Sequence, residues 1–237
     1  LWKSHFNYLL PFFKDDRAIR IDNKIVVLIY QPSLIEKGTE MLNYWRELAS
    51  QNGIGDLYFI AVKNHQIVNN ESFNPYDGIL KFQPREAYTS VEFSSDNKVN
   101  HFSFLRKLPE SVLKYVRRIY MNFDSYHIYD SRKLWEIILS KAYIKEEGLE
   151  DKDVFESAYF EWDNTPRYGK KAKIFTRLSK DELQENLSRL LSKAKENNSP
   201  YVFFNAWNEW SECAYLEPDK KNEYENLQIV LDSLSNI

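Results

Sequence analysis

Apolar runs alternate along the chain with segments in which apolar residues recur every three or four positions. The first run, 24–30, reads Lys-Ile-Val-Val-Leu-Ile-Tyr and is typical of a strand buried on both faces of a parallel sheet. Segment 39–51 follows with helical spacing, and Asn52 and Gly53 end it as helices commonly end. A buried strand followed by an amphipathic helix indicates an α/β fold.

The same alternation continues to the C-terminus. Further strands are predicted at 57–62, 78–82, near 154–160 within 153–162, and at 201–207, although Glu156 and Glu161 leave the bounds of the 153–162 strand open. Further helices are predicted at 112–119, 134–144, 179–197 and 223–234, and Ser179 and Glu182 have capping-box spacing. Five strands separated by helices predict a parallel sheet. No linker or second domain is visible, so residues 1–237 are interpreted as one domain.

The number of strands suggests part of a larger architecture. A closed (β/α)8 barrel needs about three more strand–helix units than these five strands supply. The chain also starts at Leu1, within a helical pattern. We therefore interpret it as the C-terminal portion of a (β/α)8 barrel that lacks its N-terminal part, with the 24–30 strand at an open edge. An open five-stranded sheet that is complete as it stands is the alternative.

Composition and charge narrow the classes of function. Hydrophobic residues make up 43% and aromatic residues 16% of the 237 residues, enough for a sizeable core with rings left over for a cleft. The formal net charge of −3 and the pI near 5.9 argue against a nucleic-acid-binding protein. Cys213 is the single cysteine, which excludes an intramolecular disulfide, and the four histidines show no metal-binding spacing. No apolar run is long enough to span a bilayer.

The most informative segment is 201–212, Tyr-Val-Phe-Phe-Asn-Ala-Trp-Asn-Glu-Trp-Ser-Glu, where an apolar run ends in two carboxylates. Glu209 and Glu212 stand three positions apart, beside Trp207 and Trp210. Charge at the end of a buried strand is costly unless it is paired, solvated in a cleft or used. Aromatic rings stack on the apolar faces of sugars, and an acid and a base are what cleavage of a glycosidic bond requires. The segment therefore predicts a carbohydrate site.

Active sites of parallel α/β folds lie at the C-terminal ends of the strands. Asp163 is equally compatible with a helix cap, Arg167 is equally compatible with a solvated charge, and Tyr30 and Gln31 are more simply explained as structural. Segment 217–219 is interpreted as a turn before the last helix, and Cys213 as a small residue in a tight turn. The polar and aromatic candidates at the strand ends are Tyr30, Gln31, Lys81, Gln83, Trp162, Asp163, Asn164, Arg167, Asn205, Trp207, Asn208 and Trp210.

Two of these segments carry a resemblance to a known family. Residues 204–219, Phe-Asn-Ala-Trp-Asn-Glu-Trp-Ser-Glu-Cys-Ala-Tyr-Leu-Glu-Pro-Asp, closely resemble the C-terminal signature of the WbsX-like glycosyltransferase family. Residues 162–167, Trp-Asp-Asn-Thr-Pro-Arg, resemble its second signature, and residues 11–32 are similar to its middle segment. The resemblance covers nearly the whole chain, although the stretch between 86 and 152 contains nothing distinctive.

The resemblance implies a fold and a chemistry. The family is related to the endo-α-mannosidases of glycoside hydrolase family 99, which are (β/α)8 barrels with an Asn-Glu-Trp-x-Glu motif. By this resemblance Glu209 is the base, which deprotonates the neighbouring 2-hydroxyl of the sugar, and Glu212 is the general acid that protonates the leaving oxygen. The family commonly has glycine where this chain has Cys213.

The resemblance also implies a biological setting. We expect an enzyme that cleaves or transfers a glycosyl unit of an oligosaccharide or polysaccharide during the biosynthesis of bacterial surface polysaccharide, such as O-antigen or capsule. We expect it in the cytoplasm, with no metal or cofactor in the catalytic step and with polysaccharide assembly enzymes as candidate partners.

Two other classes of function remain open. One is a glycan-binding or assembly protein that keeps the cleft without catalysis. Retention of both Glu209 and Glu212 favours the enzyme, because binding alone tolerates amides. The other is a nucleotide-sugar transferase of conventional design, which predicts a glycine-rich phosphate loop or a metal-binding Asp-x-Asp motif. Neither motif is visible in this sequence.

Overall fold

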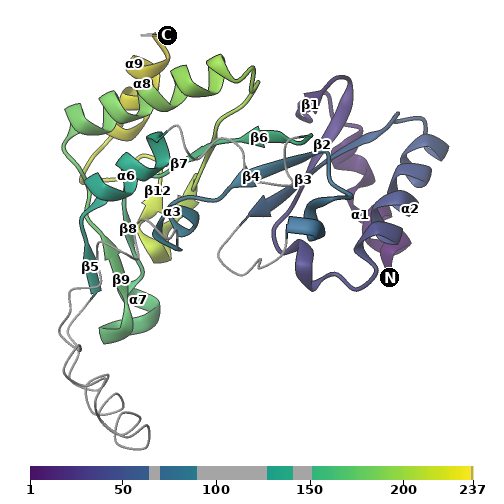
Figure 1. Ribbon diagram of the computed structural model, residues 1–237, viewed down its shortest axis with the longest axis horizontal. Coiled ribbons are helices and arrows are strands. Elements are labelled where there is room, and N and C mark those ends of the chain that lie inside the picture. Colours follow the sequence, from purple (N-terminus) through teal and green to yellow (C-terminus); the bar gives the residue numbers. More distant parts are fainter. Residues whose placement is uncertain (64–69, 90–126, 141–150, 236) are drawn as a thin grey trace, which may run out of the picture. The chain divides into compact units, whose positions relative to one another are not determined.

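The structure is a computed structural model that describes residues 1–63, 70–89, 127–140, 151–235 and 237 (Figure 1). The predicted helix at 112–119 and the end of the predicted 134–144 helix lie outside the described residues. The chain forms two compact units, each built from three stretches of sequence. Unit 1 comprises Leu1–Glu86, Lys141–Ser157 and Ser192–Phe203, and unit 2 comprises Ala87–Ser140, Ala158–Leu191 and Phe204–Ile237.

Unit 1 contains a five-stranded sheet in which four neighbouring strands are parallel. Val27 lies opposite Phe59, and Leu80 lies opposite Phe155. The strands predicted at 24–30, 57–62 and 78–82 are confirmed to within one residue, and the parallel sheet with helices confirms the α/β class. The strands, in the order of the sheet, are β1 (Arg20–Ile21), β2 (Lys24–Ile29), β3 (Leu57–Lys63), β4 (Gly78–Lys81) and β6 (Asp153–Phe155).

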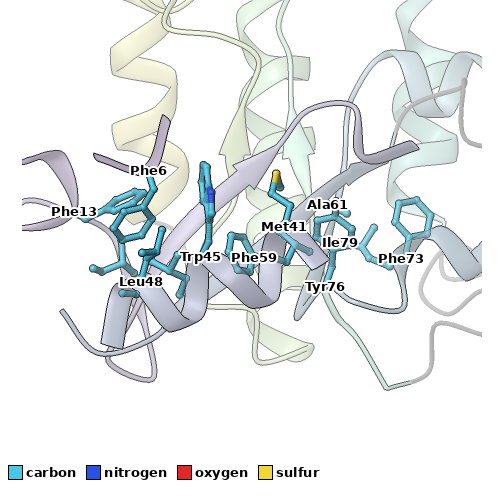
Figure 2. Close-up of a cluster of buried hydrophobic side chains, with 14 residues drawn as sticks. Phe6, Phe13, Met41, Trp45, Leu48, Phe59, Ala61, Phe73, Tyr76 and Ile79 are labelled. Atoms are coloured by element: carbon cyan, nitrogen blue, oxygen red, sulfur yellow. The ribbon is translucent and has the colours of Figure 1, made fainter. Parts of the chain in front are cut away.

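The main core of unit 1 lies between this sheet and helices α1 (Trp2–Phe13) and α2 (Gly38–Gln51) (Figures 1 and 2). Trp45 of α2 is 2% exposed, and its indole N–H donates to the carbonyl of Trp2 at 3.2 Å. Burial of each large side chain of this kind contributes about 2 kcal/mol. Trp45, on the helix predicted at 39–51, is therefore a core residue.

Strand β2, near the edge of the sheet, differs from its prediction in both burial and pairing. The 24–30 strand was predicted to be buried on both faces and to lie at an open edge, but within β2 only Ile25 is buried, and β1 pairs antiparallel with Lys24 and Ile25. Asp22 and Asn23 form the connecting turn with φ of 49° and 64°, a conformation that these two residue types tolerate. The start of this edge is therefore covered by the chain's own hairpin, whereas β3 is the strand that is buried along its length.

The last two predicted strands are shorter than expected. Segment 153–162 is divided into β6, β7 (Ser157–Ala158) and β8 (Trp162–Asp163), and the 201–207 run forms only β10 (Phe203–Phe204), which pairs with β7. The Ser157 hydroxyl donates to the carbonyl of Lys81 at 2.6 Å and accepts the backbone N–H of Gln83 at 2.9 Å. A side chain thus takes a place that a regular backbone ladder would fill.

Helix ends in the second half of the chain follow their local capping signals. Ser179 and Glu182 form the predicted capping box, with backbone N–H contacts of 3.0 and 3.3 Å, so the 179–197 helix is confirmed. The predicted 134–144 helix instead starts at Ser131, because Asp130 accepts the N–H of Arg132 at 2.9 Å, and it ends at Leu139. The 223–234 helix is confirmed at Glu225–Ser235.

Unit 2 is built around a three-stranded sheet in which β5 (His127–Tyr129) runs parallel to β9 (Lys173–Phe175) and β8 runs antiparallel to it. None of the described helices combines the length and apolar character that crossing a membrane requires. The remaining elements are η1 (Pro32–Leu34), η2 (Asn70–Phe73), α3 (Arg85–Thr89), α6 (Ser131–Leu139), α7 (Thr165–Tyr168), η5 (Gly169–Lys171), α8 (Lys180–Glu196), β11 (Asn208–Glu209), η6 (Trp210–Glu212), β12 (Ala214–Tyr215) and α9 (Glu225–Ser235).

A buried ion cluster joins elements that are far apart in the sequence of unit 1. One oxygen of Glu156 lies 2.9 Å from the ammonium of Lys193 and 3.4 Å from that of Lys81, and all three side chains are at most 9% exposed. Burial lowers the pKa of Lys81, and the charge of Glu156 opposes this effect. The Glu156 carboxylate therefore compensates two buried positive charges.

Replacement of Glu156 tests this dependence. Glu156→Gln should lower the free energy of unfolding by about 3 kcal/mol, because both ammonium groups lose the carboxylate they share. Urea denaturation followed by circular dichroism measures the change. Glu47→Gln, at an exposed position of α2, is the matched control and should change little. An unchanged midpoint for Glu156→Gln would show that the cluster does not hold unit 1 together.

Candidate functional site

The two candidate carboxylates come from one short hairpin of unit 2. β11 and β12 pair antiparallel, with Glu209 opposite Ala214, and η6 connects them. Cys213 closes the turn with φ 51° and ψ 21°. Residues three apart in a 3₁₀ turn lie on the same side of it. Glu209 precedes η6 and Glu212 ends it, so the backbone places the two residues on the same side of one turn.

The two carboxylates have different surroundings. Glu212 is buried, at 4% exposure, whereas Glu209 is half-buried. Ser211, which lies between them, donates its hydroxyl hydrogen to Oε1 of Glu209. This bond restrains the Glu209 side chain at the start of the turn.

Glu212 is paired with an arginine from the other signature segment. Nη1 of Arg167 donates to Oε1 of Glu212 at 2.9 Å, and the Arg167 side chain is 52% exposed. This hydrogen bond and the charge of Glu212 raise the pKa of Arg167, and the charge of Glu209 adds to the effect. Arg167 is thus paired with Glu212 and lies within electrostatic reach of Glu209, while half of its side chain stays exposed to solvent.

Trp210 forms a fixed aromatic surface on the same hairpin. Its ring stacks on Tyr215 with 4.1 Å between centroids and 26° between planes, and its indole N–H donates to Oε2 of Glu217 at 2.9 Å. Trp210 nevertheless remains 46% exposed. Tyr215 in turn donates to Asp219, whose pKa is lowered by the backbone N–H of Asn222 and by this hydroxyl. One face of Trp210 is held in place while the side chain stays accessible, which suits stacking on a sugar.

The segment before Arg167 is organised by its own polar side chains. Asp163 accepts the backbone N–H of Thr165 at 2.8 Å and also its hydroxyl, and these bonds hold the first residue of the short α7 that carries Arg167. The Asn164 side-chain oxygen accepts the N–H of Lys173 at 2.8 Å, and Trp162 is buried. These contacts fix the segment and present Arg167 at its exposed end.

The other candidates are spread over both units. In unit 2, Trp207 and Asn208 are exposed and Asn205 is buried, with its N–H on the carbonyl of Ala158 at 2.9 Å. In unit 1, the Tyr30 hydroxyl accepts from Arg85 at 3.0 Å, and Gln31 precedes η1.

Two more candidates in unit 1 take part in polar contacts of the core. Lys81 belongs to the buried ion cluster with Glu156. The Gln83 side chain donates to Glu86 at 3.2 Å. Both are therefore supporting residues in the described structure.

Sequence reasoning assigned no role to Ser211, Glu217 or Asp219 in this site. A hairpin signal in the sequence would have indicated them. Two short strand-like runs flank Cys213, a position where the family commonly has glycine and where the chain adopts the left-handed conformation that glycine tolerates. Burial, followed by the carboxylates of Asp163 and Glu161, raises the pKa of the Cys213 thiol, which disfavours a nucleophilic thiolate. Within the described part of the chain, no three His, Cys, Asp or Glu side chains gather as a metal site.

The chain is similar to one protein family and to two curated proteins. The family model described as Glycosyltransferase WbsX matches residues 1–230. Two proteins named "Uncharacterized protein WxcX", from Xanthomonas campestris pv. campestris strains B100 and ATCC 33913, are each 24% identical over 231 residues. The match covers 96% of this chain but only 29% of each relative's length.

A solved structure described as a "Glycoside hydrolase-like protein" shares the fold. It superposes with a TM-score of 0.58 at 14% identity, over 98% of this chain and 60% of that chain. At this identity the likeness concerns the fold alone.

The left-handed turn at Cys213 gives a direct test of the hairpin. Cys213→Gly should be more stable than Cys213→Ala by about 1 kcal/mol, because only glycine adopts positive φ without a Cβ penalty. The Ala variant is the matched control, since both substitutions remove the thiol. Chemical denaturation of the two variants measures the difference. Equal stability, or a more stable Ala variant, would argue against this turn geometry.

Proposed function

The chain belongs to the WbsX glycosyltransferase family, and from this premise we propose that it is a carbohydrate-active enzyme that uses Glu209 as base and Glu212 as acid. Its substrate is an oligosaccharide or polysaccharide, from which it cleaves or to which it transfers a glycosyl unit. The setting we propose is the cytoplasmic biosynthesis of bacterial surface polysaccharide, such as O-antigen or capsule, beside polysaccharide assembly enzymes.

The observation that carries this proposal is the hairpin. Glu209 and Glu212 stand at the two ends of one turn, beside an indole that is held by Tyr215 and Glu217 and remains accessible. An acid–base pair next to a restrained aromatic surface is what glycosidic chemistry requires. The acid and base also differ in burial, which is how two carboxyl groups acquire different roles.

The proposed architecture is the C-terminal portion of a (β/α)8 barrel. The parallel order β2, β3, β4, β6 and the fold likeness to a glycoside hydrolase-like protein support it. In such a barrel the carboxyl ends of the strands carry the site, and segments 162–167 and 205–212 begin at the ends of the strands predicted at 153–162 and 201–207. Substrate contacts from the unit 2 residues Trp162, Asp163, Asn164, Asn205, Trp207 and Asn208 belong to this proposal. Tyr30 and Gln31 lie in unit 1 and stay predictions of the sequence.

A glycan-binding protein without catalysis is the second candidate. The Arg167–Glu212 ion pair favours it, because Oε1 of Glu212 already accepts from Arg167 at 2.9 Å and is thereby occupied in a structural contact. The same hairpin would then bind sugars through Trp210 alone.

Amide substitutions separate the roles of the two acids. In the complete gene product, Glu212→Gln should lower the turnover rate of natural glycosides by a factor of about 10² or more. It should spare activated substrates, whose leaving group needs no proton. Glu209→Gln should stop both reactions while leaving ligand binding largely intact. The assay is release or transfer of sugar from the surface polysaccharide of the source strain, followed by chromatography and NMR.

Glu185→Gln, at an exposed position of α8, is the matched control and should keep full activity. Full activity in both Glu209→Gln and Glu212→Gln would replace the enzyme with the glycan-binding candidate. In a liganded structure, attack through the sugar's own 2-hydroxyl requires the two carboxyls to be further apart than the ~5.5 Å of direct nucleophilic retention.

A further inference from the structure

We propose that unit 2 binds a single internal water molecule between helix α6 and the segment that follows β7, and that Ser131, Trp135 and Tyr159 hold it. Three polar atoms are enclosed there: Oγ of Ser131, Nε1 of Trp135 and the hydroxyl oxygen of Tyr159. These residues are 0%, 1% and 0% exposed, and within the described part of the chain none of the three atoms has a hydrogen-bond partner. All three lie outside the proposed acid–base pair, so water binding here is independent of the proposed function.

Enclosed polar groups of this kind need partners. In native proteins nearly every buried donor or acceptor is hydrogen-bonded to protein or to ordered water, because an unsatisfied buried group has lost its hydration without compensation. The rings that pack on Tyr159 supply no acceptor for its hydroxyl. Trp135 stacks on it with 5.7 Å between centroids and 11° between planes, and Phe175 meets it edge-on at 6.5 Å. Three such groups in one core therefore indicate a bound polar molecule.

The fold brings the three groups to one place. Ser131 is the first residue of α6 and Trp135 stands four positions later, so their side chains lie on the same face of the helix. Tyr159 packs on that face through the stacked Trp135 ring. Burial raises the pKa of Tyr159, and the Ser131 hydroxyl opposes this effect. The two hydroxyls are therefore neighbours, although their geometry is not that of a direct hydrogen bond.

The enclosure and the chemistry of the three groups select water as the ligand. Since none of the three residues is more than 1% exposed, a ligand larger than water does not fit among them. The indole N–H of Trp135 is a donor only, so it cannot ligate a cation, whereas the two hydroxyls both donate and accept. A water molecule accepts from Trp135 and exchanges hydrogen bonds with Ser131 and Tyr159. Three partners is the usual number for an internal water.

A water at this position connects two elements that are distant in the sequence. Ser131 and Trp135 belong to α6, and Tyr159 lies between β7 and β8. The carbonyl of Ala158, directly before Tyr159, accepts the N–H of Asn205 at 2.9 Å. The water thus fixes α6 against the start of the segment that leads to residues 162–167.

Removal of one hydroxyl distinguishes a hydrated site from a dry one by the sign of its effect. In the complete gene product, Tyr159→Phe should speed hydrogen exchange of the α6 backbone amides roughly fivefold or more, because the water and the groups it bridges lose a partner. In a dry site the same change removes an unsatisfied hydroxyl and should slow exchange. Hydrogen–deuterium exchange with mass spectrometry measures the rates. Tyr224→Phe, at a 70% exposed position of unit 2, is the matched control and should leave them unchanged.

A crystal structure of the complete gene product, at a resolution that shows ordered water, locates the ligand directly. We expect one water within about 3 Å of Ser131 Oγ, Trp135 Nε1 and the Tyr159 hydroxyl oxygen. A dry site or a direct hydrogen bond between Ser131 and Tyr159 would overturn the inference. So would unchanged or slower exchange of the α6 amides in Tyr159→Phe.

Discussion

The ion pair between Arg167 and Glu212 joins the two segments from which the candidate site is built. One segment ends in a helix of four residues and the other forms a hairpin of two-residue strands, and neither is long enough to be stable alone. The pair spans 45 positions of sequence at 2.9 Å. A buried carboxylate requires such a partner, so the position of Glu212 and the path of the 162–167 segment depend on each other.

Each unit treats buried charge in a different way. In unit 1 the carboxylate of Glu156 is shared by Lys81 and Lys193, and all three side chains are closed off from solvent. In unit 2 the buried Glu212 is paired with a side chain that is half in solvent. The first arrangement stabilises a core. The second leaves the charged Arg167 side chain exposed at the surface, and this difference supports our proposal that the chemistry involves Glu212.

The aromatic side chains divide in the same manner. Trp45 and Trp162 are buried and serve packing, whereas Trp210 is held by Tyr215 and Glu217 and stays accessible. Local hydrogen bonds by Ser211, Asp163 and Asp219 fix the loops that carry these groups. A site assembled from short elements acquires its rigidity from such side-chain contacts rather than from regular backbone ladders.

The sequence by itself determined the elements whose pattern is local. Continuous apolar runs identified β2, β3 and β4, helical periodicity identified α2, α8 and α9, and the capping box identified the start of α8, because burial and capping leave a periodic trace in neighbouring residues. The run at 201–212 also marked Glu209 and Glu212 as candidates, and its motif indicated the family.

Only the tertiary structure decided what depends on contacts between distant residues. The break of the 153–162 strand, the hairpin at Asn208–Tyr215 and the pairing of β1 with β2 all follow from side-chain or turn contacts that no periodicity records. Sequence spacing left Arg167 equally compatible with a solvated charge or a ligand contact, and its partner lies in another segment. The role of a charged side chain depends on the residues that it contacts, and the fold determines those contacts.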